Sequence, residues 1–431
     1  LLTAATAAGI VVLGYRRLSL TLPVAALTAT IWAVAVPTLM LSTAVMSEPL
    51  FLALLIPTLL LAERAARDGG LRATAGTCVM LALCTLVRSI GVSGFAAFGL
   101  VLMARRRWRE LGVAVVTGAA GLAPWIIWKR LHRTHLPVAW AGMYGDYDHW
   151  LTDGLTSHGV RLVWKVVLQN ARDVVEAFAV YWSEGPEGTF RNVIAVLLLV
   201  SLVAGVAACW RRVPVVVWTL LTYIAIVLLW PFHPQRFVWG AGPLWVPLAT
   251  AGVLRSWQGM KTAMTSRPSR ALASAVLAVV VLCIPVGSLL AVRTRAWNRV
   301  PRSGVASALP MIRWIVKNTP PDAVLASDAE TVIYLYTGRR GLPYVPFKAA
   351  DRVGLMTPSE AYAGLAEVLR LYHPRWVYAL GAGPLKVAGH FTTHDGAPLR
   401  VLAVLAYGAV FETRGLPTQP AVPSTHEPAG R

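Results

Sequence analysis

Three short polar turns interrupt long apolar runs and hold the side chains most able to do chemistry. Their sequences are MSEPLF, LVRSIG and HPQRF, and their candidate residues are Glu48, Arg88, His233, Gln235 and Arg236. An ionisable group at the centre of a membrane helix costs about 2.5–3.5 kcal/mol on insertion scales, so such groups tend to mark a polar cavity or an ion or phosphate site. The turns therefore predict a membrane enzyme that handles an anionic, lipid-linked substrate.

Glu48 and Arg88 each allow two interpretations. Glu48 precedes Pro49 at the start of an apolar run, where a carboxylate is stabilised by the helix dipole. It could be a simple cap at the membrane interface, or it could orient an acceptor hydroxyl or a charged donor. Arg88 could reach lipid headgroups with its long side chain. The favoured interpretation is a cavity arginine paired with a phosphate or with Glu48.

The HPQRF turn offers several hydrogen-bond donors beside a proline. Arginine suits phosphate because its guanidinium donates two parallel hydrogen bonds. Trp230 and Trp239 flank the turn, and tryptophan is enriched at the membrane interface, where lipid phosphates lie. An ordinary polar turn between helices is the alternative, and the sequence favours contact with phosphate.

Two aspartates, Asp146 and Asp148, lie two residues apart in a loop rich in tyrosine and tryptophan. Such a pair could bind a divalent cation or act as a catalytic base, although surface loops also carry carboxylates for solubility, and that interpretation is favoured. The cysteines Cys78, Cys84 and Cys209 lie in apolar runs, as does Cys283, and no metal-ligand motif is present.

Composition indicates a polytopic membrane protein, with 56% hydrophobic and 14% charged residues in a chain of 431. The formal net charge of +20 would suit nucleic acid, but its distribution indicates topology instead. Basic residues gather in the turns that alternate to one side of the membrane, which makes a nucleic-acid partner improbable. They are Arg16, Arg17, Arg64, Arg67, Arg72, Arg105, Arg106, Arg107, Arg109, Arg211, Arg212, Arg255, Lys261, Arg267 and Arg270.

The apolar runs predict an α-helical membrane domain over residues 1–292 with about ten membrane helices, the first one partial. They fall near 1–14, 20–45, 49–62, 73–104, 111–128, 191–210, 213–232, 237–254 and 271–292. The run 73–104 is long enough to fold back on itself near Arg88. Residues 129–190 form an outer loop, in which 158–180 has the pattern of an amphipathic helix. That helix would lie on the membrane surface or, as the alternative, pack on a protein surface.

The composition changes after residue 292, and residues 293–414 predict a small α/β domain outside the membrane. Helices are expected at 303–318, at 328–337 before Gly338, and from the capping box at Thr357–Glu360 to about Tyr372. Short strands are expected at 323–327, 375–380 and 399–406. The proline-rich stretch 415–431 predicts a disordered tail.

The order of these pieces resembles the C-type (GT-C) superfamily of polytopic membrane glycosyltransferases, which includes protein mannosyltransferases and the aminoarabinose transferases of lipid A. STAVMSEPLF is similar to the acidic turn of that group, LVRSIG to its arginine turn and FHPQRF to its HPQR turn. The stretch NTPPDAVLASDAETVIYLYTGRR resembles the start of the extracytoplasmic domain of bacterial members. The resemblance covers most of the chain and implies a cell-membrane location.

The resemblance also implies a reaction: an acceptor hydroxyl displaces a polyprenyl phosphate from a sugar, with inversion. Glu48 would position the acceptor or the donor headgroup, with Asp146 and Asp148 as further carboxylate candidates; Arg88, His233, Gln235 and Arg236 would hold the phosphate. No nucleotide cofactor is implied, and no nucleotide-binding motif appears. The acceptor would be a lipid, glycan or protein. The family's principal base, an aspartate in the first outer loop, is expected before Leu1, so either the chain is a fragment or it lacks that base.

A rival hypothesis is a carrier that moves an anionic lipid-linked substrate without chemistry. A transporter often shows related halves in its sequence, and none is evident here. The sequence therefore favours the enzyme.

Overall fold

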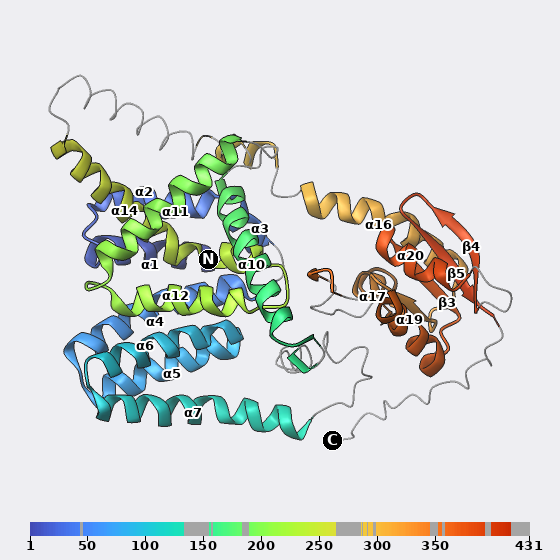
Figure 1. Ribbon diagram of the computed structural model, residues 1–431, viewed down its shortest axis with the longest axis horizontal. Coiled ribbons are helices and arrows are strands. Elements are labelled where there is room, and N and C mark those ends of the chain that lie inside the picture. The colour runs from blue at the N-terminus through green and yellow to red at the C-terminus, as the bar shows by residue number, and fades with distance from the viewer. Residues whose placement is uncertain are drawn as a thin grey trace. The chain divides into compact units, whose positions relative to one another are not determined.

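The computed structural model divides the chain into two compact units. One unit contains residues 1–134 and 164–298, and the other contains residues 135–163 and 299–431. The residues that the structure describes are 1–43, 46–132, 155–156, 158–182, 189–263, 286, 288–290, 292–295, 299–344, 352–355, 358–392 and 398–414. Figure 1 labels the helices of the first unit and the helices and strands of the second.

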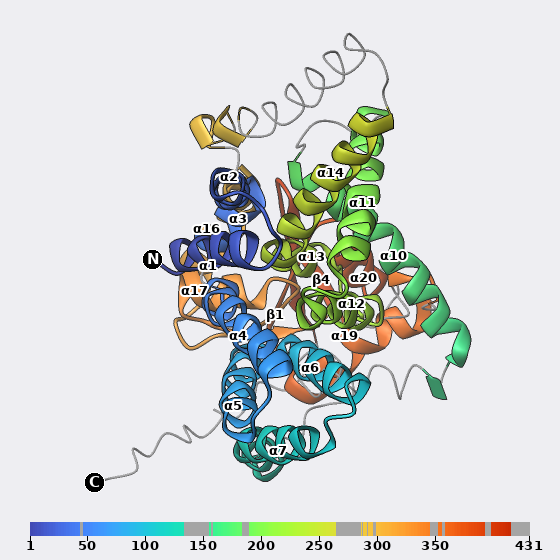
Figure 2. The same ribbon diagram turned by 90° about the vertical axis from the view of Figure 1, so that its left-hand side faces the viewer.

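The first unit is a bundle of helices. Its first half consists of α1 (Leu2–Arg16), α2 (Leu22–Val34), α3 (Val36–Thr43), α4 (Glu48–Asp68), α5 (Leu71–Val87), the short 3-10 helix η1 (Ser89–Gly91), α6 (Val92–Ala104) and α7 (Trp108–Leu131). Helix α1 packs on α2 and α4, and α5 packs on α4 and α7. Figure 1 shows α4, α5, α6 and α7 running alongside one another, and Figure 2 shows the same helices closer to end-on.

The second half of the bundle consists of α10 (Val160–Trp182), α11 (Thr189–Cys209), α12 (Pro214–Leu228), α13 (Gln235–Gly240) and α14 (Gly242–Ala263). Helix α12 packs on α6, and α11 packs on α14. The second contact depends on two glycines, because a Cβ on Gly205 would overlap the carbonyl oxygen of Leu248 and a Cβ on Gly252 would overlap that of Ser201. Small residues at such crossings let helix backbones approach closely.

Two apolar runs that the sequence predicts as single helices are broken. The run 20–45 divides into α2 and α3, which are bent by 59° at Ala35. Pro37 explains the break, because proline inside a helix removes a hydrogen bond and clashes with the preceding turn. The run 237–254 divides into α13 and α14 at Ala241, between Gly240 and Gly242. By contrast, the run 73–104 folds back after α5, as predicted.

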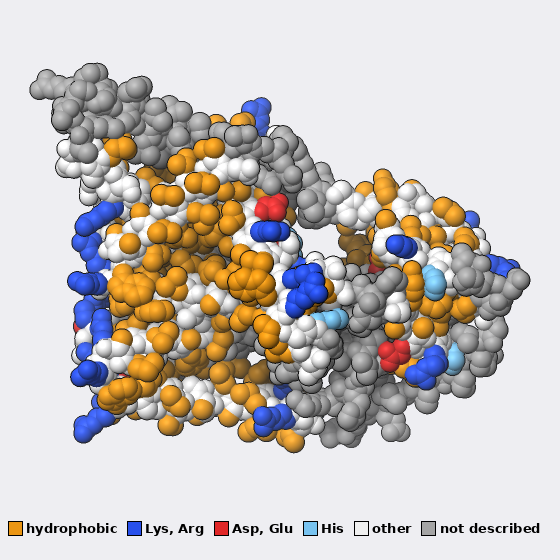
Figure 3. Space-filling model, in the orientation of Figure 1, with side chains coloured by type: hydrophobic (Ala, Val, Ile, Leu, Met, Phe, Trp, Pro, Cys, Tyr) orange, Lys and Arg blue, Asp and Glu red, His pale blue; other side chains and the backbone are white. Residues whose placement is uncertain are grey.

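Among the described residues, α4 and α7 are long and apolar enough to cross a membrane, and the bent pair α2–α3 would make a third span. The expected number of about ten membrane helices is therefore not confirmed. Several helices are shorter than the roughly 20 residues that a span needs. Hydrophobic side chains nevertheless cover most of the visible face of the first unit, and Lys and Arg side chains gather along one end (Figure 3). Trp125, Ile126, Ile127 and Trp128 of α7 are all exposed.

The second unit contains a five-stranded mixed sheet in the order β2-β1-β3-β5-β4. Its elements are α16 (Arg299–Asn318), β1 (Val324–Ser327), α17 (Glu330–Thr337), β2 (Arg340–Pro343), α19 (Pro358–Tyr372), β3 (Trp376–Leu380), α20 (Ala382–His390), β4 (Leu399–Leu405) and β5 (Gly408–Thr413). Strands β1, β2 and β3 are parallel, and β5 runs antiparallel to both β3 and β4.

Helices cover both faces of this sheet. On one face, Val377 and Ala379 of β3 pack with Leu365 of α19 and Ala388 of α20. On the other face, Trp376 and Tyr378 pack with side chains of α16 and α17. A strand buried on both faces is apolar along its whole length, and WVYAL fits this rule. The predicted small α/β fold is present, although β2, β5 and α20 are not predicted from the sequence.

Candidate functional site

Glu48 is the first residue of α4, and its carboxylate is buried in the bundle. The residue is 1% exposed. Pro49 follows at the first turn of the helix, where proline's missing N–H has no cost. The polar turn thus starts a helix as the sequence predicts. Its carboxylate, however, faces partners inside the bundle rather than water, and a buried charge requires a partner of opposite sign.

Arg88 provides the first partner. It lies at the end of α5, where its extended backbone separates α5 from η1. Its Nη1 donates to Glu48 Oε1 at 2.7 Å and also lies 3.3 Å from the Oγ of Ser47. The Arg88 side chain is only 12% exposed. The guanidinium also lies over the Phe237 ring, 5.5 Å from its centroid, which adds a cation–π contact. Arg88 is therefore a largely buried arginine paired with Glu48, which is one of the two partners that the sequence favours for it.

Arg236 provides the second partner, from the first turn of α13. Its Nε donates to Glu48 Oε1, and its Nη2 donates to Glu48 Oε2 at 2.9 Å. This two-pronged contact is the geometry in which arginine binds a carboxylate or a phosphate most strongly. Unlike Arg88, the Arg236 side chain is 47% exposed. One side of its guanidinium holds the buried carboxylate while the rest remains accessible.

The three charged side chains therefore form one cluster, although 188 residues separate Glu48 from Arg236. Two guanidinium groups and one carboxylate give the cluster a formal charge of +1. An arginine has five N–H donors, and Glu48 and Ser47 are the hydrogen-bond acceptors of these two arginines among the described residues. The cluster keeps an excess positive charge and several donors for an anion.

Two aromatic residues hold the turn that contains Arg236. The hydroxyl of Tyr223, on α12, donates to the carbonyl oxygen of Phe237 at 3.0 Å. Tyr223 is 2% exposed. Phe237 also packs on Trp230, with ring centroids 5.5 Å apart. These contacts fix the backbone next to Arg236. Tyr223 is not among the residues predicted from the sequence, although it is the one tyrosine within the apolar helix Pro214–Leu228.

Helix α10 also holds this turn in place, through hydrogen bonds from Asn170. Asn170 is completely buried, and its Nδ2 lies 3.1 Å from the carbonyl oxygen of Val227, 2.8 Å from that of Leu228 and 2.7 Å from that of Trp230. Val227 and Leu228 are the last residues of α12, whose final carbonyls lack partners within the helix, and Trp230 follows the end of the helix. The predicted amphipathic helix therefore packs on the bundle along one face. No sequence signal identifies Asn170 as special.

The other residues of the HPQRF turn are placed less tightly. His233 Nε2 lies 3.8 Å from the carboxylate of Asp173 on α10, and the His233 side chain is 55% exposed. Gln169 donates to Asp173 at 2.9 Å, which orients that carboxylate. The Gln235 side chain has no hydrogen-bond partner among the residues that the structure describes. His233 and Gln235 thus lie beside Arg236 without contacting Glu48.

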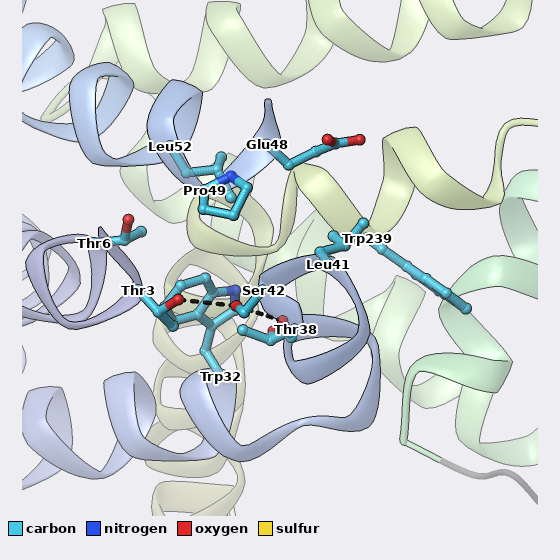
Figure 4. Close-up of a pocket in the computed structure, with 10 residues that line it drawn as sticks. All are labelled: Thr3, Thr6, Trp32, Thr38, Leu41, Ser42, Glu48, Pro49, Leu52 and Trp239. Carbon is cyan, nitrogen blue, oxygen red and sulfur yellow. Dashed lines mark hydrogen bonds between the residues drawn. The ribbon is translucent and has the colours of Figure 1, made fainter. Parts of the chain in front are cut away.

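A small polar pocket adjoins the cluster (Figure 4). Its volume is about 10 Å³, which is room for about one water molecule. Hydroxyl groups of Thr3, Thr38 and Ser42 line it, as does Trp32, whose buried Nε1 has no hydrogen-bond partner among the described residues. Figure 4 shows the Glu48 carboxylate pointing away from these hydroxyls. The pocket therefore suits a bound water rather than a sugar.

Asp146 and Asp148 lie outside the described residues, so their candidate role stays a prediction. In the part of the chain that the structure describes, no three His, Cys, Asp or Glu side chains gather as possible metal ligands. Cys78, Cys84 and Cys209 are buried free thiols, and Cys283 lies outside the described residues. The candidate site therefore consists of Glu48, Arg88 and Arg236, with His233 and Gln235 beside them.

Comparisons with known proteins agree on the fold. No protein-family profile and no curated protein sequence matches the chain. The structure of ArnT from Cupriavidus metallidurans bound to undecaprenyl phosphate superimposes with a TM-score of 0.52 at 12% identity, covering 95% of this chain and 82% of that one. The apo structure of the same protein gives a TM-score of 0.50 at 10% identity with the same coverage. The chain thus has the fold of ArnT, which confirms the GT-C-like fold expected from the resemblance.

Proposed function

We propose that this protein is a membrane glycosyltransferase that moves a sugar from a polyprenyl-phosphate donor to an acceptor outside the cytoplasm. The observation that carries the proposal is the cluster of Arg88 and Arg236 around the buried Glu48 carboxylate, with its formal charge of +1. The fold agrees with it, because a solved structure of this fold is bound to undecaprenyl phosphate. A carrier without chemistry has no specific observation in its favour.

In the proposed reaction, the oxygen of an acceptor hydroxyl attacks the anomeric carbon of the sugar from the side opposite the phosphate. The new carbon–oxygen bond forms as the bond to the phosphate oxygen breaks, which inverts the anomeric configuration. The hydroxyl proton passes to a carboxylate base. Asp146 and Asp148 are candidates for that base within this chain, and both lie outside the described residues.

Arg236 and Arg88 would stabilise the charge that develops on the leaving phosphate. Fixed cationic donors aimed at such a charge lower the barrier without reorganisation during the reaction. Glu48 accepts donors on both of its oxygens. We therefore assign it the role of orienting the two guanidinium groups, whereas His233 and Gln235 are candidates for outer contacts to the phosphate.

The test is sugar transfer from a polyprenyl-phosphate donor by the full chain, compared between wild type, Arg236→Ala and Arg236→Lys. A hydrogen bond to a charged group contributes about 1.5–3 kcal/mol, so we expect kcat to fall roughly 10- to 100-fold in Arg236→Ala. Arg236→Lys should be impaired too, because an ammonium group cannot donate in parallel. Loss of a transition-state contact should lower kcat more than it raises the acceptor KM.

The matched control is Arg64, which is 74% exposed and ion-paired with Asp68 at the far end of α4. Arg64→Ala removes the same charge and should leave turnover unchanged. Unchanged donor-dependent turnover in both Arg236 variants would assign Arg236 to structure and contradict the proposed phosphate contact.

A further inference from the structure

Three arginines surround a hollow at the end of the first unit opposite the Glu48 cluster. Arg211 and Arg212 lie in the turn between α11 and α12, and Arg255 lies on α14. The hollow has a volume of about 430 Å³. Helix α12 relates the two ends. In its first turn, the backbone N–H of Val216 donates to Glu63 Oε1, and Glu63 lies near the end of α4. Tyr223 of α12 and the HPQRF turn that follows the helix lie at the Glu48 cluster, near the start of α4.

The charge of this hollow is not neutralised by the described part of the chain. Among the residues that the structure describes, no carboxylate lines it and none of the three arginines forms an ion pair. Within the same residues, the arginines make one hydrogen bond, from Arg212 Nη1 to Ser19 Oγ at 3.1 Å. The sequence from residue 188 to residue 321 contains no Asp or Glu. The segments that build the hollow thus provide no carboxylate, and like charges held together destabilise one another unless an anion is present.

The other lining residues suit a lipid. Ala207, Ala208 and Trp210 complete the hollow, and Trp210 is 42% exposed, with its ring packed on that of Trp218 at 5.1 Å between centroids. Tryptophan is characteristic of the membrane interface. Figure 3 shows basic side chains gathered at one end of a face that is otherwise hydrophobic. A ligand at such a boundary needs a negative headgroup and an apolar tail.

We propose that Arg211, Arg212 and Arg255 form a binding site for the phosphate headgroup of an anionic membrane lipid, separate from the site of sugar transfer. Guanidinium groups bind phosphate oxygens in pairs, and basic pockets between membrane helices bind anionic headgroups. The lipid would join α11, α12 and α14 at this end of the bundle. The site requires no catalysis and stands independently of the proposed transferase activity.

The test is native mass spectrometry of the full chain with equimolar phosphatidylglycerol and phosphatidylcholine. Wild type should retain phosphatidylglycerol preferentially. One basic residue at an anionic surface strengthens binding about fivefold, so the preference should fall at least about fivefold in Arg255→Gln and further in the triple variant Arg211→Gln, Arg212→Gln and Arg255→Gln. The single variant lies on a helix surface and keeps the test usable if the triple variant does not fold.

The matched control is Arg64→Gln with Arg67→Gln and Arg72→Gln, which removes three charges from another basic turn. Arg64 and Arg67 already have Asp68 as a partner, so the lipid preference should persist. If the control variant lost its preference for phosphatidylglycerol equally, the effect would be general charge attraction and the proposed site would be wrong. The proposal would also be wrong if the wild type showed no preference between the two lipids. Displacement of the lipid by millimolar inorganic phosphate would assign the hollow to a free anion instead.

Discussion

At the scale of single residues, the main feature of the candidate site is a buried charge, the carboxylate of Glu48. Glu48 is nearly inaccessible to water, and its carboxylate survives there because Arg88 and Arg236 both donate to it. Removing one partner of a buried pair leaves an uncompensated charge and costs about 3–5 kcal/mol, whereas replacing the whole pair by apolar groups can be neutral. Glu48 is therefore expected to matter for the order of the site as much as for its chemistry.

This expectation gives a first prediction, for Glu48→Gln. The glutamine has a similar shape but no charge, and its amide N–H groups oppose the guanidinium of Arg88, which is only 12% exposed. We expect thermal unfolding in detergent to occur at lower temperature, with a loss of about 3–5 kcal/mol of stability. The double variant Glu48→Gln with Arg88→Met should recover part of this loss. If the stability loss of the double variant equals the sum of the losses in Glu48→Gln and Arg88→Met alone, Glu48 and Arg88 are not coupled.

At the scale of elements, the sequence predicts helices and strands well where one physical signal dominates. Gly338 ends α17 with a φ of +69°, a left-handed conformation that favours glycine, and β3 is a continuous apolar run. The sequence does not predict the breaks at Ala35 and Ala241, because apolar composition continues across them. It does not predict strand β2 either, because four residues including Pro343 carry no periodic signal.

Helix α10 gives a second prediction, because Asn170 ties it to the end of α12. The variant Asn170→Leu keeps the size of the side chain and removes the donors to Val227, Leu228 and Trp230. We expect amide hydrogen exchange at residues 231–237 to become at least about fivefold faster, since a lost buried bond costs about 1–3 kcal/mol. Exchange should not change elsewhere in the bundle.

Asn318→Leu is the control for this experiment, because Asn318 makes one exposed bond, to the carbonyl oxygen of Trp314 in the second unit. It should not affect exchange at 231–237. Unchanged exchange there in Asn170→Leu would mean that Tyr223 and Phe237 hold the turn without α10.

A third prediction concerns Asp328, which follows β1 in the second unit. Its Oδ1 accepts the backbone N–H of Leu380 at 2.8 Å, yet burial raises the pKa of this carboxyl from 3.8 to about 6. Between pH 4 and pH 6 the folded state therefore binds more protons than the unfolded state. The stability that Asp328 contributes to the second unit should be complete below about pH 4, should be lost as the pH rises to about 6, and should then stay constant.

The measurement is urea unfolding of the full chain at pH 4.5 and pH 7, followed by the 5-fluorotryptophan NMR signal of Trp376, which is buried in the second unit. Asp328→Asn removes the titrating group and should flatten this part of the pH dependence. A variant that retains the wild-type slope would place the titration in a group other than Asp328.

At the scale of the whole molecule, the sequence predicts which residues meet but not how. A charged side chain within an apolar run has a high free-energy cost unless it has a partner. That cost predicts that Arg88 pairs with Glu48 or a phosphate and that Arg236 binds a phosphate. It does not reveal that Arg236 binds Glu48 through both oxygens, or that Tyr223 and Asn170 hold its turn. Those contacts depend on how α10, α12 and α13 pack together. Neutral buried residues such as Tyr223 and Asn170 carry no sequence signal that predicts this packing.

The distribution of basic residues gives the last prediction, the topology of the chain in the membrane. Positive turns stay on the cytoplasmic side because lysine and arginine oppose translocation. Arg105, Arg106 and Arg107 should then face the cytoplasm, and the second unit should lie outside. In a variant without native cysteines, Arg106→Cys and Ser359→Cys replace exposed residues. A membrane-impermeant maleimide added to intact cells should label Ser359→Cys, whereas Arg106→Cys should react only after the membrane is opened. Labelling of both from the same side would contradict this topology and place the polar turn of Glu48 on the face opposite to its proposed substrate.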